Sequence, residues 1–349
     1  MNATSGRADV AVDGVPGAPA GQRPARVAAV DCGTNSLRLL IADVDPARGT
    51  LTDVTRQMEI VRLGQGVDAT GRLAAGALAR TLTALAGYAA VIEAHPVQAT
   101  AMVATSAARD AANAADFARG VNEILGVTPQ VLSGDQEARL SFAGATAELT
   151  RPGQAAPSCP PPYLVADIGG GSTEFVLGPG WPAGGSLPAG QLSAVSVDIG
   201  CVRMTERHLR SDPPRPAEIA AATADIDAAL SVVAAKLAVP SARTLLGLAG
   251  SVTTVAAIAL DLPGYDAARI HHARIPAATV HEVTAGLLAR TRAERALIGV
   301  MHPGRVDVIG AGALVLDRIV ARFGFADVIA SEHDILDGIA WSLAAGLPR

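Results

Sequence analysis

The chain has almost no lysine. Among its 28 basic residues only Lys236 is a lysine, and the others are arginines. A Walker P-loop needs a lysine directly after its glycines, whereas Lys236 lies in the segment AAKLAV, far from any glycine-rich turn. Any phosphate that this protein binds is therefore held without a P-loop lysine.

Aromatic residues and cysteines are also scarce. Aromatics make up 3% of the chain and the net charge is −5, so neither a stacking platform for bases nor a basic face for nucleic acid is evident. The three cysteines, Cys32, Cys159 and Cys201, lack metal-ligand spacing and are odd in number, which excludes a complete disulfide framework. We expect a cytoplasmic protein that does not bind nucleic acid.

No long apolar run is present. The longest apolar stretch, residues 245–260, is interrupted by Gly250 and by hydroxyl residues, so it predicts a buried strand, turn and helix and no membrane association. Residues 1–26 are rich in alanine, glycine and proline without an apolar core, which predicts a disordered tail rather than a signal peptide. With half of its 349 residues hydrophobic, the chain is long enough for about two domains.

Two segments of the chain align without a gap. They are AVDCGTNSLRLLI at residues 29–41 and VADIGGGSTEFVL at residues 165–177, whose Asp and Ser residues are both 136 positions apart (167 − 31 and 172 − 36). Each reads as a strand, an Asp, a tight turn and a second strand, which predicts a β-hairpin with Asp, Gly and Ser at its tip. The repeat predicts two similar halves.

Helical and strand patterns alternate around these hairpins. Ser133 and Gln136 form a capping box that predicts a helix start. The other predicted elements are helices along residues 78–92, 106–125 and 217–237, a helix from Ser251, helix starts at Thr279 and Thr291, strands at 194–198 and 244–248, and loops at 151–162 and 179–190. We therefore expect an α/β fold with two lobes facing each other across a cleft.

The two hairpin tips have the composition of phosphate-binding turns. Glycine adds no Cβ, so backbone N–H groups can approach phosphate oxygens closely. One such tip is weak evidence, because ordinary tight turns use the same residues, but two matching tips that each follow an Asp favour phosphate binding. Asp31 and Asp167 would repel each other in one cleft unless a hard cation such as Mg²⁺ lay between them.

These motifs resemble those of a known superfamily. DCGTNSLRLL and DIGGGSTEFVL resemble the first and second phosphate motifs of the actin-like (ASKHA, ribonuclease H-like) superfamily, and GLAGSVTTVAA at residues 247–257 is similar to its third. ATSAARDAAN at 104–113, SGDQEARL at 133–140 and the STE of the second hairpin resemble the exopolyphosphatase and guanosine pentaphosphate phosphohydrolase (Ppx/GppA) family. The resemblance runs from about Val27 to the end of the chain.

The resemblance implies an architecture of two actin-like lobes of the short, two-domain type. Residues 27–143 would form the first lobe and residues 144–349 the second, and it stays open whether the C-terminal helix packs back on the first lobe. Relatives with two lobes often dimerise, so a homodimer is expected.

The resemblance also implies roles for individual residues. Glu137 would be the general base that activates water, Glu174 the second catalytic carboxylate, and Asp31 and Asp167 the ligands of Mg²⁺ or another divalent cation. The implied phosphate-binding residues are Gly33, Thr34, Asn35, Ser36, Arg109, Gly169, Gly170, Gly171, Ser172, Thr173, Gly250 and Ser251.

Each of these residues also has a structural interpretation. A glutamate such as Glu137 in the first turn of a helix is favoured by the helix dipole alone. Without the motif, Glu174 would be an exposed hairpin residue and Arg109 a solvated helix charge. We interpret HPGRVDVIGAGALVL, around Arg305, as architecture, and the segment SEHDILDGI differs from the basic version of that turn common in the family.

The implied reaction is release of terminal phosphate from inorganic polyphosphate, and short chains are the expected substrates. The motifs do not separate polyphosphate from guanosine pentaphosphate as substrate. An ATP-dependent kinase or ATPase of the same superfamily is one alternative, although it does not predict SGDQEARL. A sensor that binds guanosine tetraphosphate or pentaphosphate without catalysis is another, and it would tolerate loss of Glu137.

Overall fold

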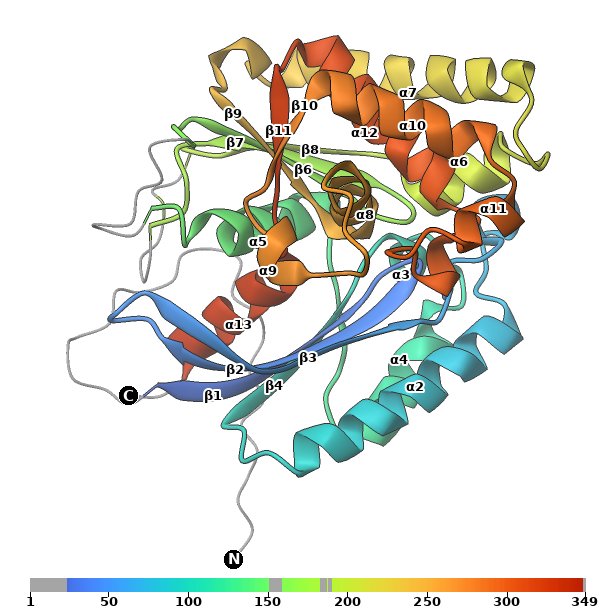
Figure 1. The fold of residues 1–349 in the computed structure, drawn as a ribbon. Helices are drawn as coiled ribbons and strands as arrows, with labels where there is room; N and C mark the ends of the chain where they lie inside the picture. The colour runs from blue at the N-terminus through green and yellow to red at the C-terminus, as the bar shows by residue number, and fades with distance from the viewer. Residues whose placement is uncertain (1–23, 151–158, 183–186, 188–189, 348–349) are drawn as a thin grey trace, which may run out of the picture. The chain divides into compact units, whose positions relative to one another are not determined.

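The computed structural model describes residues 24–150, 159–182, 187 and 190–347. The chain forms two compact units (Figure 1): one takes its residues from Met1–Pro157, Gly180–Gln191 and Asp334–Arg349, and the other from Ser158–Pro179 and Leu192–His333. The end of the chain thus belongs to the first unit. Most of the predicted N-terminal tail lies outside the described residues, but strand β1 begins at Ala25, within the range assigned to that tail.

The first unit is built on a five-stranded sheet with the order β3-β2-β1-β4-β5. Its strands are β1 (Ala25–Cys32), β2 (Ser36–Asp45), β3 (Thr50–Ile60), β4 (Ala99–Ala104) and β5 (Gln130–Val131). Strands β1, β2 and β3 are antiparallel neighbours, whereas β4 runs parallel to β1 and β5 parallel to β4. The first predicted hairpin is therefore confirmed as β1 and β2.

Both faces of this sheet are covered. Side chains alternate between the two faces, so the residues of one strand contribute to two cores. Along β1, Ala28 and Val30 belong to one core cluster and Val27 and Ala29 to another. The helices of the unit are α1 (Val67–Thr70), α2 (Ala75–Glu93), α3 (Ser106–Arg109), α4 (Ala114–Leu125), α5 (Gly134–Thr146) and α13 (Ile335–Gly346). Helices α2 and α4 pack on the first cluster, while α13 packs on the second and contacts α5 (Figure 1).

Helix α2 is the one helix among the described residues that is long and apolar enough to cross a membrane by length and composition. Its Leu85 and Tyr88 are buried in the core of the first unit, and the Tyr88 hydroxyl donates to the Leu37 carbonyl at 3.1 Å. Core helices of globular proteins pass the same test, and this packing indicates such a helix.

The second unit has a six-stranded sheet with the order β10-β11-β9-β6-β7-β8. Its strands are β6 (Tyr163–Ile168), β7 (Thr173–Gly178), β8 (Ser193–Val197), β9 (Thr244–Leu248), β10 (Arg274–Pro276) and β11 (Asp327–Ala330). Its helices are α6 (Cys201–Arg207), α7 (Pro216–Lys236), α8 (Ala249–Ala259), α9 (Ala267–Ile270), α10 (Ala277–Ala289), α11 (Arg292–Ala296) and α12 (Ile309–Phe323), with short 3-10 turns η1 (Val239–Ser241) and η2 (Pro303–Arg305). One large cluster of aliphatic side chains forms its core.

Most predicted elements are present, and the second hairpin is confirmed as β6 and β7. The capping boxes at Ser133 and Thr291 are confirmed as the starts of α5 and α11. The predicted helix at 106–125 is wrong as a single helix, because it is broken into α3 and α4. The break lies where the Asn113 side chain exchanges two hydrogen bonds with the backbone of Leu73.

The predicted helix start at Thr279 is also wrong. Helix α10 begins two residues earlier, directly after Pro276, which pairs with Asp327 as the last residue of β10. Parts of the predicted loops at 151–162 and 179–190 lie outside the described residues.

Candidate active site

The two hairpin tips fold in the same way. The Gly33 N–H donates to the Ser36 carbonyl at 2.9 Å, and the Gly169 N–H donates to the Ser172 carbonyl at 3.1 Å. The two donors are 136 positions apart (169 − 33), and so are the two acceptors (172 − 36), which is the offset of the sequence repeat. The repeated motif therefore forms the same turn in each unit.

The first tip is held by the loop after β3. Val61 and Arg62 donate their N–H groups to the Asn35 carbonyl, and the Gly64 N–H donates to the Thr34 carbonyl at 2.9 Å. A Cβ on Gly64 would collide with the Thr34 side chain, so this close approach requires glycine. Because C=O and N–H point in opposite directions within a peptide group, the amides that follow these two carbonyls point away from the loop.

The second tip is held by the start of α6. The N–H groups of Cys201 and Val202 donate to the carbonyls of Gly169 and Gly170 at 2.9 and 2.8 Å, and the Arg203 side chain donates through Nε to the Gly171 carbonyl at 2.7 Å. The carbonyls of the tip thus face α6 and its amides face the opposite way. Such runs of outward-pointing N–H groups bind anions, which fits both predicted phosphate-binding tips.

Glu137 and Arg109 lie together in the first unit. Glu137 is 8% exposed in the first turn of α5, and Arg109, at the end of α3, donates through Nη1 to its Oε2 at 3.3 Å and to the Leu132 carbonyl at 3.0 Å. At the other end of α3, the Ser106 hydroxyl is hydrogen-bonded to that of Thr34 at 2.9 Å. One short helix therefore connects the first hairpin tip with the candidate base.

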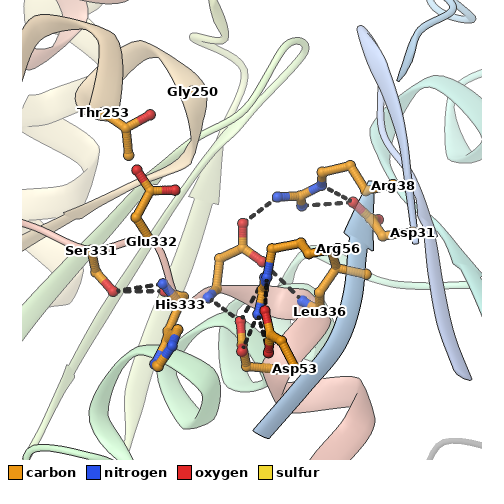
Figure 2. Close-up of polar contacts among 12 residues, drawn as sticks. Asp31, Arg38, Asp53, Arg56, Gly250, Thr253, Ser331, Glu332, His333 and Leu336 are labelled. Atoms are coloured by element: carbon orange, nitrogen blue, oxygen red, sulfur yellow. Dashed lines mark hydrogen bonds and ion pairs between the residues drawn. The ribbon is translucent and has the colours of Figure 1, made fainter. Parts of the chain in front are cut away.

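Asp31 is the predicted cation ligand of the first unit, and the structure describes hydrogen bonds to one of its two carboxylate oxygens. It is 2% exposed, and its Oδ2 accepts from Nε and Nη2 of Arg38 at 3.0 and 2.7 Å (Figure 2). Burial raises the pKa of Asp31, and the Arg38 guanidinium opposes that rise. Among the described residues, no hydrogen-bond donor reaches its buried Oδ1. That oxygen fits a hard cation ligand.

Asp167 and Glu174 lie opposite each other on β6 and β7 of the second unit. They are 7% and 1% exposed, and Glu174 accepts a hydrogen bond from the Ser196 hydroxyl at 2.7 Å. Glu174 is therefore buried, which contradicts its interpretation as an exposed hairpin residue. Two buried carboxylates at directly opposite positions repel each other, so this pair also fits a cation.

The third motif forms the start of α8. Ala249 has φ 67°, a left-handed conformation, immediately before Gly250 and Ser251. The Arg305 guanidinium lies where a Cβ of Gly250 would be, and its Nη1 donates to the Gly250 carbonyl and to the Thr254 hydroxyl at 3.3 Å. The side chain of Ser251 is buried, and its hydroxyl lies against the backbone of Gly312.

Two arginines at these motifs were missed as candidate site residues. Arg38 belongs to the quoted segment DCGTNSLRLL, and its position directly opposite Asp31 on a two-stranded hairpin was the available signal. Arg305 was interpreted as architecture, yet it contacts the third motif from a turn 55 positions away (305 − 250). No local pattern in the sequence indicates that contact.

Comparisons with known proteins agree with this geometry. The chain is 48% identical over 330 residues to "Exopolyphosphatase 2" of Mycobacterium tuberculosis, a match that covers 91% of this chain and 98% of that protein. A crystal structure of an exopolyphosphatase-like protein, 41% identical, superposes with a TM-score of 0.84 and covers 92% of this chain and 98% of its own. The Ppx/GppA member from Aquifex aeolicus, 27% identical, superposes with a TM-score of 0.73 over 91% of this chain and 97% of its own.

The fold of the relatives and the two sheet-and-helix units confirm the predicted two-lobed actin-like α/β fold. The family model described as "Ppx/GppA phosphatase family" matches residues 40–345, which include the whole second hairpin and the end of the first. By this match and by its full-length relatives, the chain belongs to the Ppx/GppA phosphatase family.

Proposed function

We propose that this protein is an exopolyphosphatase, which hydrolyses the terminal phosphoanhydride bond of inorganic polyphosphate. The contact between Arg109 and Glu137 carries the proposal. These side chains come from two motifs typical of the family, and they meet beside a hairpin tip suited to phosphate. The name of the Mycobacterium tuberculosis relative supports the same activity.

In the proposed reaction, the oxygen of a water molecule attacks the terminal phosphorus while Glu137 accepts a proton from that water. The bond from that phosphorus to the bridging oxygen breaks, so inorganic phosphate leaves and the polymer is one unit shorter. Arg109 would hold oxygens of the transferred group, because a guanidinium forms paired hydrogen bonds with phosphate. The hairpin amides would bind the charge that remains on the phosphates.

A divalent cation, taken to be Mg²⁺, would neutralise phosphate oxygens when bound. Asp31 of the first hairpin and Asp167 of the second are its proposed carboxylate ligands. Two observations support a cation at these positions: Oδ1 of Asp31 has no hydrogen-bond partner among the residues that the structure describes, and Asp167 and Glu174 lie opposite each other. Glu174 would act as the second catalytic carboxylate.

Short polyphosphates are the proposed substrates, because the motifs resemble those of the short, two-domain type of the family. Guanosine pentaphosphate is the second candidate, since the family name includes that activity. A homodimer in the cytoplasm stays a prediction from the resemblance. The kinase and sensor alternatives are less favoured, because neither requires a buried glutamate held by Arg109.

The decisive experiment is to measure phosphate release from short polyphosphate, guanosine pentaphosphate and ATP with Mg²⁺. The informative variant is Glu137→Gln, which keeps the size of the side chain and removes the base. Asp135→Asn is the matched control, because Asp135 lies in the same helical turn but points to Arg139 at the surface. General-base catalysis contributes about 10²- to 10⁴-fold, so Glu137→Gln should lose at least 100-fold of kcat.

Asp135→Asn should retain kcat within about a factor of two, because solvated surface pairs contribute little. Equal activity of Glu137→Gln and wild type would exclude the proposed base. Turnover of ATP only in the presence of an added acceptor would instead favour the kinase. Binding of guanosine pentaphosphate without any phosphate release would favour the sensor.

A further inference from the structure

Arg38 connects the proposed cation ligand with the C-terminal helix of the first unit. Its Nε and Nη2 donate to Oδ2 of Asp31 at 3.0 and 2.7 Å (Figure 2), and its Nη1 forms an ion pair with Oδ2 of Asp334. Asp334 is 5% exposed and caps α13, where its Oδ1 accepts from the Leu336 N–H at 3.0 Å. The guanidinium is therefore fixed at both ends by buried carboxylates.

The corresponding position of the second hairpin holds the opposite charge. Arg38 is the cross-strand partner of Asp31, and Glu174 is the cross-strand partner of Asp167, so the two are equivalent in the repeat (174 − 38 and 167 − 31 both give 136). The second hairpin thus presents two carboxylates, whereas the first presents one carboxylate with an arginine on one of its oxygens. Arg38 occupies Oδ2 of Asp31, and no hydrogen-bond donor from the described part of the chain reaches Oδ1.

Fixing one oxygen of a carboxylate orients the other. Groups that hydrogen-bond to metal ligands set their orientation, and loss of such groups lowers metal affinity about 10- to 100-fold. An arginine has a long side chain with several rotatable bonds, and both of its hydrogen bonds to Asp31 go to the same oxygen, so Asp31 alone restrains the guanidinium less than two carboxylates do. The second contact, with Asp334, adds that restraint.

We propose that Arg38 and Asp334 are positioning residues for the cation site, which hold Asp31 so that Oδ1 points to the ion. The inference rests on the proposed function, because it takes Asp31 as a cation ligand. It assigns a role to the acidic turn SEHDILDGI, which the family resemblance left unexplained. Asp334 acts through Arg38 and touches neither the substrate nor the ion.

A matched control lies one helical turn further along α13. Asp337 also pairs with an arginine of the sheet: Arg56 donates to its Oδ1 at 2.6 Å and also contacts Asp53 at 2.8 Å. Arg56 has no hydrogen bond to Asp31 among those that the described residues form. Asp334→Asn and Asp337→Asn each weaken one ion pair between helix and sheet, and each keeps an amide oxygen that can accept the capping hydrogen bond.

The experiment measures Mn²⁺ binding to the full chain without substrate, by electron paramagnetic resonance of the free ion. Addition of Mg²⁺ to the Mn²⁺ complex is the competition control, and release of Mn²⁺ would show that both ions use one site. We expect Asp334→Asn to raise the Kd for Mn²⁺ about tenfold, and Asp337→Asn to leave it within twofold of wild type. Arg38→Lys, which keeps the charge but not the two-pronged contact, should resemble Asp334→Asn.

Thermal unfolding without cation verifies that all variants fold, and a purely structural role would lower the melting temperature of both Asn variants without separating their Mn²⁺ affinities. Equal Mn²⁺ affinity of wild type, Asp334→Asn and Arg38→Lys would overturn the inference and leave the proposed function intact. A wild-type protein that binds no Mn²⁺ would overturn the proposed cation and this inference together.

Discussion

At the scale of single residues, the two hairpins share a backbone and differ in charge. Asp31 faces a guanidinium and Asp167 faces a carboxylate at the same position of the repeat. Opposite charges on facing strands stabilise a sheet and like charges destabilise it, by roughly 0.2–1 kcal/mol per pair. The second hairpin therefore places two buried carboxylates opposite each other, and clusters of buried ionisable groups are frequent at functional sites.

This pair gives a prediction for Glu174→Gln. Without cation, the variant should unfold at a slightly higher temperature than wild type, because the repulsion of Asp167 is removed while the Ser196 hydroxyl keeps an oxygen acceptor. A gain of about 0.2–1 kcal/mol is expected, together with a loss of phosphate release. The measurement is thermal unfolding with and without Mg²⁺. If the variant is less stable than wild type when both lack Mg²⁺, the expected gain in stability is contradicted.

The sequence predicted which residues form the tips but not which partners hold them. The motif placed Asp31 and Asp167, and the spacing of the repeat placed their turns. The arginine contacts escaped prediction because Asp334 and Arg38 are 296 positions apart (334 − 38), and only the fold of the chain brings them together. Contacts of this kind depend on tertiary packing, which short-range patterns do not encode.

At the scale of secondary structure, capping residues were the most informative local signals. The Ser133 hydroxyl accepts from the Gln136 N–H at 3.3 Å and the Gln136 side chain accepts from the Ser133 N–H at 3.0 Å, as the pattern predicts. The same pattern failed at Thr279, where strand pairing of Pro276 fixes the start of α10 two residues earlier. Tertiary contacts therefore override a local cap where the preceding residue is already paired.

The two confirmed capping boxes allow a comparison of structure with activity. Ser133→Ala and Thr291→Ala each remove a cap, which costs about 1 kcal/mol of the free energy of unfolding. Only α5 carries Glu137 in its first turn, so only Ser133→Ala should also lower kcat, by about 3- to 10-fold, an order-of-magnitude estimate for a misplaced catalytic group. Urea unfolding and steady-state assays measure the two effects, and an equal loss of kcat in both variants would refute the assignment.

At the scale of the whole molecule, the repeat predicted two similar units, and two units with separate cores are present. Their composition in chain segments was harder to predict. The first unit includes α13 from the C-terminus, whose Ile339 and Trp341 pack with residues of β1 and β2. A hydrophobic pattern shows that a helix has an apolar face but not which sheet it covers, so the sequence left this packing open.

Separate cores predict separate cooperative unfolding. Ile339→Ala in α13 and Ile319→Ala in α12 each empty a fully buried site, one in each unit, and each should cost about 2–5 kcal/mol. If each unit opens on its own, Ile339→Ala will weaken the protection of β1 and β2 against hydrogen exchange and leave that of β6 and β9 unchanged. Ile319→Ala will weaken the protection of β6 and β9 and leave that of β1 and β2 unchanged. Exchange that accelerates throughout the chain in both variants would show instead that the two cores unfold as one, and that the repeated halves no longer behave as separate domains.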